Sequence, residues 1–177
     1  MEIDLVRNRY LSEKEKAAIN DARVANWGEG ALKDFDEDYE SDTLWIFVRD
    51  EGKIVSLGGM RPIEINYLGK CYNIFGICST ISVVRGKGYG KVMIGGMLDY
   101  IKQTGKSALG FTTQTEFFVK AGFKAEKDFI KRFVWVKGNG ERVLDNEGDG
   151  IFWNGKDGFL KRVLESDSLV EIGIEHW

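Results

Sequence analysis

The order of apolar and polar positions predicts a chain in which strands and helices alternate. A largely β-branched run, 81–84, is typical of a strand. After residue 91, apolar residues recur at helical spacing: Val92, Met93, Met97, Leu98 and Ile101. The run 81–84 ends a strand predicted at 71–84, and similar patterns predict strands at 1–9, 44–49, 54–66, 107–112 and 129–137, and helices at 12–26, 115–121 and 159–164. Ser12 and Glu15 form the capping-box pattern expected at the start of the first helix. This mixture predicts an α/β fold.

Three alternating glycines, Gly86, Gly88 and Gly90, separate the strand at 71–84 from the helix that follows it. Glycine lets the backbone come close to a ligand, and the first N–H groups of a helix point outward with a favourable dipole. The cationic side chains Arg85 and Lys87 belong to the same turn, as does Lys91. This glycine turn, residues 85–91, therefore predicts a site for a phosphate-bearing ligand.

The spacing of the glycine turn excludes two common phosphate motifs. A Walker loop would need Ser or Thr after Lys91, where Val92 stands, and the dinucleotide fingerprint would need a third glycine at Lys91. The turn does fit R-x-x-G-x-G, read as Arg85, Gly88 and Gly90. That pattern resembles the pyrophosphate motif of the GNAT superfamily of acetyl-CoA-dependent N-acyltransferases, and 117–123 resembles the superfamily's F-Y-x-x-x-G-F segment.

The resemblance implies a fold and a cofactor. The fold would be a central, mixed, twisted sheet of about seven strands with flanking helices. Two strands would splay apart, and acetyl-CoA, the acyl donor, would bind in the gap. Gly76 indicates a bulge in the strand at 71–84, and Pro62 an edge or bulged position. The predicted cofactor-binding residues are Ile81, Val83, Arg85, Gly86, Lys87, Gly88, Tyr89, Gly90, Lys91 and Phe118.

The usual catalytic groups of the superfamily are missing. Alignment on the glycine turn places Thr80 where many members carry a glutamate base, and Phe118 where many carry a tyrosine acid. His176, the only histidine, is a candidate base if the C-terminal tail folds over the site, although a penultimate residue is also compatible with a solvated end. Cys78 fits a small buried hydrophobic residue better than a nucleophile. The catalytic base and acid are therefore unassigned.

Acidic residues without a basic residue among them characterise the segment 34–42. A solvated loop explains such a run, and so does a rim that attracts cations. Together with Trp177 at the C-terminal end, this segment resembles the aminoglycoside 2'-N-acetyltransferases. That resemblance implies carboxylates that bind a polycationic acceptor. The predicted substrate-binding residues are Asp34, Asp36, Asp38, Asp149, Glu175 and Trp177.

Composition bounds the remaining possibilities. The 177 residues predict a single GNAT domain, 1–177, whose tail, 141–177, contributes to the substrate side. A net charge of −3 disfavours a nucleic-acid partner. We expect a cytoplasmic protein without a membrane span or a metal site. Cys71 and Cys78, seven residues apart on one predicted strand, are too distant for a disulfide.

The sequence therefore predicts the transfer of an acetyl group from acetyl-CoA to a primary amine of a small, polycationic, aminoglycoside-like molecule. Two alternatives stay open. The acceptor amine would belong to a peptide or protein, or the chain would be a catalytically silent acyl-CoA-binding module. The identity of the acceptor, the acyl chain length and the oligomeric state, including a homodimer, stay open as well.

Overall fold

The computed structural model describes residues 1–144 and 148–173. Backbone contacts divide the chain into two compact units. The first comprises Met1–Arg61 and Cys78–Met97, and the second comprises Pro62–Ile77 and Leu98–Trp177. Two long strands, β3 (Lys53–Tyr67) and β4 (Lys70–Ser82), and the helix α2 (Tyr89–Thr104) each contribute residues to both units. We describe each unit by itself.

The strands form two sheets. The larger sheet has seven strands in the order β1-β2-β3-β4-β5-β9-β6, and the smaller has three in the order β10-β7-β8. The remaining members of the larger sheet are β1 (Glu2–Arg7), β2 (Leu44–Asp50), β5 (Ala108–Thr112), β6 (Lys124–Glu126) and β9 (Asp149–Trp153). The smaller sheet contains β7 (Phe133–Val136), β8 (Arg142–Leu144) and β10 (Val170–Ile172). The mixed sheet of seven strands confirms the predicted fold class.

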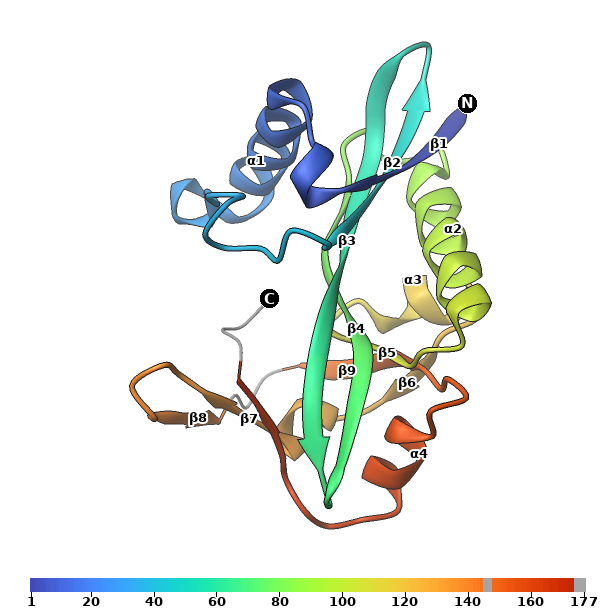
Figure 1. Ribbon diagram of the computed structural model, residues 1–177. Coiled ribbons are helices and arrows are strands. Elements are labelled where there is room, and N and C mark those ends of the chain that lie inside the picture. Colours follow the sequence, from blue (N-terminus) through green and yellow to red (C-terminus); the bar gives the residue numbers. More distant parts are fainter. Residues whose placement is uncertain (145–147, 174–177) are drawn as a thin grey trace. The chain divides into compact units, whose positions relative to one another are not determined.

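The first unit is built on antiparallel pairs of β1 with β2 and of β2 with β3. Helix α1 (Glu13–Trp27) and the first half of α2 lie on opposite faces of these strands (Figure 1). Side chains alternate across β2, so that Ile46 faces Gly96 of α2, while the indole of Trp45 donates to Asn8 on the other face. β2 is buried on both faces over Leu44–Val48, which explains its continuous apolar sequence.

The capping box predicted at the start of α1 is present. The amide of Glu15 donates to Ser12 Oγ, and the amide of Ser12 donates to the Glu15 carboxylate. The boundaries of nearby elements differ slightly from the prediction, because β1 stops at Arg7 and the short 3-10 helix η1 (Asn8–Tyr10) follows it. A second 3-10 helix, η2 (Glu29–Ala31), follows α1.

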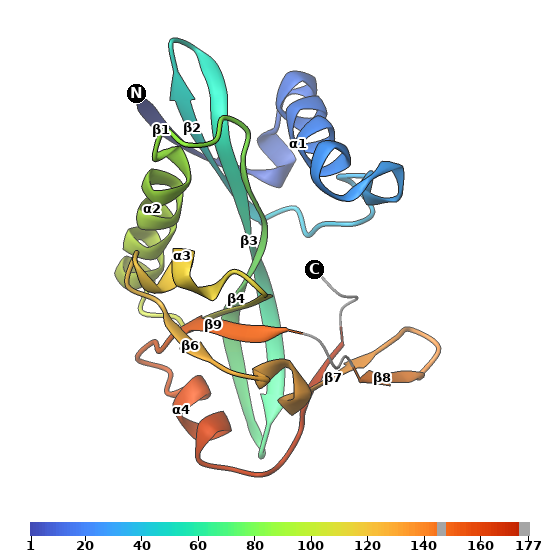
Figure 2. The ribbon, with the colours of Figure 1, turned by 180° about the vertical axis from the view of Figure 1, so that it is seen from behind.

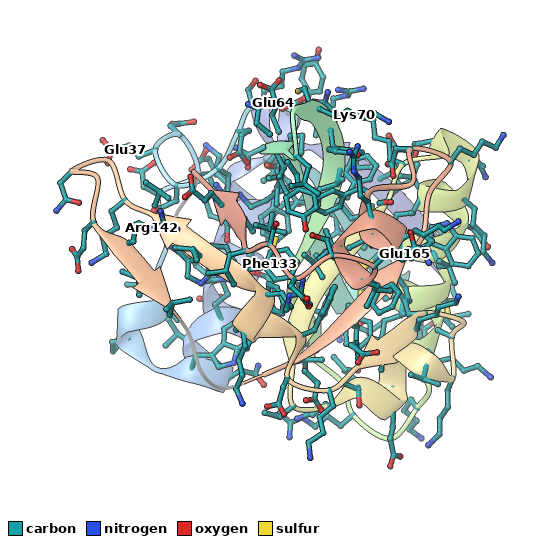
Figure 3. The ribbon with its side chains drawn as sticks, turned by 90° about the horizontal axis from the view of Figure 1, so that it is seen from below. Glu37, Glu64, Lys70, Phe133, Arg142 and Glu165 are labelled. Atoms are coloured by element: carbon teal, nitrogen blue, oxygen red, sulfur yellow. The ribbon has the colours of Figure 1, made fainter. Side chains whose placement is uncertain are left out.

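The second unit has its own aromatic core. β5 pairs with β9, and β9 pairs with β6, both antiparallel. Figure 2 shows β9 beside β6. Phe133, labelled in Figure 3, is fully buried and contacts the rings of Phe111 and Phe129. Helices α3 (Thr115–Val119) and α4 (Phe159–Leu164) also belong to this unit, and α4 contributes Phe159, Leu160 and Val163 to the core.

Three expectations about strands need correction. The predicted strand 129–137 is the 3-10 helix η3 (Phe129–Arg132) followed by β7, and β7 belongs to the smaller sheet. Pro62 lies on β3, an interior strand and not an edge strand of the larger sheet. It follows Met60, the residue at which the pairing of β3 with β2 ends, by two positions. The missing N–H of Pro62 therefore interrupts no pair with β2. In β4 the unusual backbone belongs to Ser79, with φ 49°, while Gly76 pairs with Leu109.

Candidate functional site

The glycine turn connects β4 to α2. Gly86 and Gly88 have φ values of 77° and 81°, in the left-handed region where a side chain is strained. A Cβ atom built at either position would meet nothing within 4 Å, so both glycines face open space. The amides of Lys91 and Val92 donate to the carbonyl of Gly88, at 3.0 and 3.3 Å, and so form the first turn of the helix. The turn thus has the geometry expected of an anion site.

Side-chain hydrogen bonds hold the glycine turn on two sides. Arg85 Nη2 donates to Asn26 Oδ1 on α1 at 2.9 Å. The hydroxyl of Tyr89 donates to the carboxylate of Asp50, at the end of β2, at 2.5 Å. This hydrogen bond, together with burial and the charge of Asp50, raises the pKa of Tyr89. Arg85 and Tyr89 therefore anchor the turn, whereas the side chain of Lys87 is exposed.

Solvent exposure increases from the end of β4 toward the glycine turn. Ile81, predicted to contact the cofactor, has an exposed fraction of 2%, whereas Val83 is 49% exposed. The parallel pairing of β4 with β5 covers Phe75 with Ala108 and Gly76 with Leu109, and both strands continue beyond these pairs. Contact of any of these residues with a cofactor stays a prediction.

A largely buried polar cluster, which we call the Arg61 cluster, lies beside β4 on the face away from α2. It consists of Tyr39, Glu40, Arg61 and Cys78. Arg61 makes two hydrogen bonds to Glu40, from Nε at 2.9 Å and from Nη2 at 2.7 Å. Its guanidinium also lies over the ring of Tyr39, at 5.3 Å from the centroid. This bidentate geometry fixes the segment before β2 to the middle of β3.

Burial controls the ionisation of the cluster. It raises the pKa of Tyr39 to about 12, although the charge of Arg23 and a hydrogen bond from Ser79 act in the opposite direction. Burial likewise raises the pKa of the Cys78 thiol to about 12. A thiol with so high a pKa is not a nucleophile at neutral pH, so the structure favours Cys78 as a small buried residue.

Removing the carboxylate of Glu40 should destabilise the protein, because the buried Arg61 would lose its partner. We expect Glu40→Ala to lower the free energy of unfolding by about 2 kcal/mol, less than for a fully buried pair because Glu40 is partly exposed. Denaturant titrations at neutral pH measure this loss. Glu40→Gln, which keeps the size of the side chain, serves as the control for packing.

The effect of Glu40 should depend on pH. Burial acts to raise the pKa of Glu40, but the hydrogen bond and charge of Arg61 and its other hydrogen bonds lower it overall. A lowered folded-state pKa stabilises the protein at pH values above the unfolded pKa, and this stabilisation disappears as pH falls through the folded pKa. The difference between the wild type and Glu40→Gln should therefore shrink on acidification. A difference that stays constant in acid would contradict the assignment.

Thr80 and Phe118 stand at the two positions that the sequence alignment assigns to a catalytic base and acid. Thr80 faces Gly58 of β3, on the side where Met93 and Met97 of α2 pack. Phe118 has an exposed fraction of 5% and contacts the ring of Phe123 edge-on, with centroids 5.8 Å apart. Neither side chain carries an ionisable group. His176 lies outside the described residues.

The acidic segment uses several of its carboxylates locally. Asp34 accepts hydrogen bonds from the amides of Asp36 and Glu37, and Asp38 accepts from the amide of Asp34 and from Lys33. These contacts favour the interpretation of 34–38 as a loop that stabilises its own turn.

The predicted carboxylates of the C-terminal tail are only partly described. Asp149 accepts a hydrogen bond from the amide of Asp128 at 3.0 Å. Glu175 and Trp177 lie outside the described residues, so the convergence of all six carboxylates on one acceptor stays a prediction.

The described residues contain neither a metal site nor a helix that could span a membrane. Within residues 1–144 and 148–173, no group of His, Cys, Asp and Glu side chains could hold a metal ion. Nor does any helix in the described part of the chain have the length and apolar character needed to cross a membrane. The glycine turn at the end of β4 and the Arg61 cluster beside β4 make up the candidate site in the first unit.

The fold is similar to that of several solved N-acyltransferases, although no protein-family model and no curated protein sequence matches the chain. A probable N-acyltransferase of unknown function from Enterococcus faecalis V583 superposes with a TM-score of 0.58 and 17% identity, over 73% of this chain and 33% of that protein. This chain thus spans about one third of the length of the Enterococcus protein.

Two Escherichia coli proteins match over most of their length. ElaA superposes with a TM-score of 0.57 and 15% identity, over 85% of this chain and 97% of that protein. The GNAT family N-acetyltransferase YhbS, solved in complex with CoA, superposes with a TM-score of 0.58 and 14% identity, over 97% of this chain and 89% of that protein. At these identities the likeness shows the fold. The chain therefore has the mixed α/β fold of GNAT N-acetyltransferases.

Proposed function

We propose that this protein transfers an acyl group from acyl-CoA to an amine. The observation that carries the proposal is the glycine turn between β4 and α2, where two left-handed glycines and the start of a helix face open space. Such a turn suits the pyrophosphate of CoA, because backbone N–H groups and the helix dipole both favour negative charge. The solved complex of YhbS with CoA, which shares the fold, supports this choice of donor.

The reaction would depend more on positioning than on acid–base groups. A neutral amine attacks the thioester carbon, the C–N bond forms, and the C–S bond breaks with its electron pair leaving on sulfur. The amine proton passes to water. A free thiol has a pKa near 8.5, so the thiolate leaves without a strong acid. Thr80 and Phe118 provide no such acid, and positioning alone contributes up to about 7–11 kcal/mol.

A more specific proposal concerns the two substrates. We propose acetyl-CoA as the donor and a small polycationic amine, similar to an aminoglycoside, as the acceptor. Support comes from the acidic segment, where the side chains of Asp36 and Glu37 are exposed. An acidic surface of this kind raises the local concentration of a cation. The local hydrogen bonds of Asp34 and Asp38 support the plainer explanation, so the acceptor has to be decided by experiment.

The test is the release of CoA thiol from acetyl-CoA in the presence of aminoglycosides, polyamines or peptides with free amines. We expect turnover with the polycationic small molecules, and a KM for the acceptor that rises several-fold between about 50 and 500 mM salt because surface charges are screened. Turnover only with peptides would favour the alternative acceptor. CoA binding without turnover for any amine would favour the silent module.

A further inference from the structure

Ser79 has the backbone conformation that is hardest to explain from its residue type. Four non-glycine residues of the described chain have positive φ: Glu51, Leu68, Asp128 and Ser79. The first three lie in connections between elements, whereas Ser79 lies within β4 and has an exposed fraction of 8%. A left-handed serine inside a strand persists only where its surroundings hold it there.

Arg23 of α1 supplies the hold. Its Nη1 donates to Ser79 Oγ at 2.5 Å, and its Nε donates to the carbonyl of Ala31 at 2.8 Å. Its guanidinium also lies over the ring of Trp27, 5.2 Å from the centroid. Among residues 1–144 and 148–173, no carboxylate forms an ion pair with Arg23. The hydrogen bonds to Ser79 and Ala31 therefore hold the guanidinium in one geometry.

The same helix holds the other end of the segment from Ser79 to Arg85. Asn26 follows Arg23 by three residues, so both side chains lie on one face of α1. Asn26 accepts the hydrogen bond from Arg85 at the start of the glycine turn. Between these two anchors, β3 holds the segment: Ser56 Oγ donates to the carbonyl of Ile81, and the amide of Val84 donates to the carbonyl of Val55.

We propose that Arg23 is a positioning residue for acyl transfer, which acts through Ser79 by holding β4 in its left-handed conformation directly before Thr80. The inference rests on the proposed function. Arg23 touches neither substrate in this account. It fixes the backbone conformation of 79–82, the residues that lead into the glycine turn. The position of β4 is therefore fixed when the amine attacks the thioester.

A glycine at position 79 tests whether Arg23 acts through the conformation of Ser79 or independently of it. Glycine adopts left-handed φ without strain, so Ser79→Gly keeps the conformation without any hydrogen bond from Arg23. Ser79→Ala keeps the strain and loses the hydrogen bond. If Arg23 acts through Ser79, then its removal matters when residue 79 is serine and matters little when it is glycine.

The experiment is a double-mutant cycle of Arg23→Ala and Ser79→Gly, with kcat and KM measured by thiol release. Arg23→Ala should lower kcat about 10- to 100-fold and leave the KM for acyl-CoA within about twofold, because Asn26 and Asp50 still anchor the glycine turn. Ser79→Gly should stay within about threefold of the wild type, and the double variant should resemble Ser79→Gly. A loss from Arg23→Ala that is equally large in the glycine background would overturn the proposal.

A second measurement does not depend on activity. Hydrogen exchange should become faster in 79–85 in Arg23→Ala, while β2 keeps its protection. Arg49→Ala is the matched control, because Arg49 binds Asp4 and Glu15 and so joins α1 to the sheet without contacting β4. Unchanged exchange at 79–85 in Arg23→Ala would also overturn the proposal. Absence of thiol release in the wild type would instead reject the proposed function, and the exchange result would still decide the role of Arg23 in holding β4.

Discussion

Replacing Gly88 with valine is expected to abolish the binding of CoA while the protein still folds. Gly88 has φ 81°, and a branched side chain there would occupy the open space over the helix start, where the proposed pyrophosphate lies. It would also be strained in the left-handed region, at a cost of about 1–2 kcal/mol. We therefore expect an affinity at least about 100-fold weaker, since the backbone N–H groups at the turn would be blocked.

The measurement is calorimetric titration with CoA, supported by a thermal shift. Gly69→Val is the matched control, because Gly69 has a similar φ of 76° and equally open surroundings, in the turn between β3 and β4. That control should show the same loss of thermal stability with unchanged CoA affinity. Wild-type affinity in Gly88→Val would place the cofactor elsewhere and remove the main support for the proposed function.

Local signals in the sequence predicted the parts of the fold that local interactions decide. Ser12 and Glu15 predicted the start of α1, because a capping box needs only residues three positions apart. The glycines of the turn predicted its position, since their φ values are set by the turn itself. Hydrophobic periodicity predicted the long strands β3 and β4 and the helix α2 for the same reason.

No local signal in the sequence predicted which strands from distant segments pair with one another. β9 lies between β5 and β6, although it comes from the tail, and β7 leaves the main sheet to pair with β8 and β10. These choices depend on how a whole aromatic core is filled, including Phe129, Phe133 and Phe152. The sequence alone therefore predicted no strand in the tail, although β9 is an interior strand of the larger sheet.

The candidate site likewise has a part that the sequence predicts and a part that it does not. The glycine turn was recognisable from spacing, but the contacts that hold it and the neighbouring strand join residues far apart in sequence. Arg61 and Glu40 are separated by 21 positions, and Arg23 and Ser79 by 56. The one local hint was that Arg61 stands within the otherwise apolar stretch 57–63, which indicates a buried charge with a partner but does not identify that partner.

The largest loss of stability is expected from Gly155→Ala in the second unit. A Cβ atom at this position would lie 2.3 Å from the carbonyl carbon of Lys106 and from the amide nitrogen of Ser107, and 2.5 Å from the carbonyl oxygen of Gly105. All three are backbone atoms directly before β5, so no side chain can rotate away to relieve the clash. We expect the free energy of unfolding to fall by about 3 kcal/mol or more.

Hydrogen bonds around Gly155 prevent an easy adjustment. The amide of Gly155 donates to Ser107 Oγ at 3.0 Å, and the amide of Lys156 donates to the carbonyl of Gly105 at 2.7 Å. Asp157 accepts from both the amide and the hydroxyl of Ser107, at 2.7 and 2.6 Å, and from the amide of Phe159 at the start of α4. A shift that makes room for the methyl group would therefore strain these bonds together.

Thermal unfolding measures the effect, and we expect the Tm to fall by about 10 °C. Gly138→Ala is the control in the same unit, because a Cβ atom there would meet nothing within 4 Å; it should leave the Tm within about 2 °C. Asp157→Asn tests the surrounding network separately, since it keeps the shape of the side chain and removes the charge that receives the Ser107 bonds. A Tm for Gly155→Ala close to that of Gly138→Ala would mean that the loop before α4 yields easily, and β5 would then not depend on Gly155 for its position.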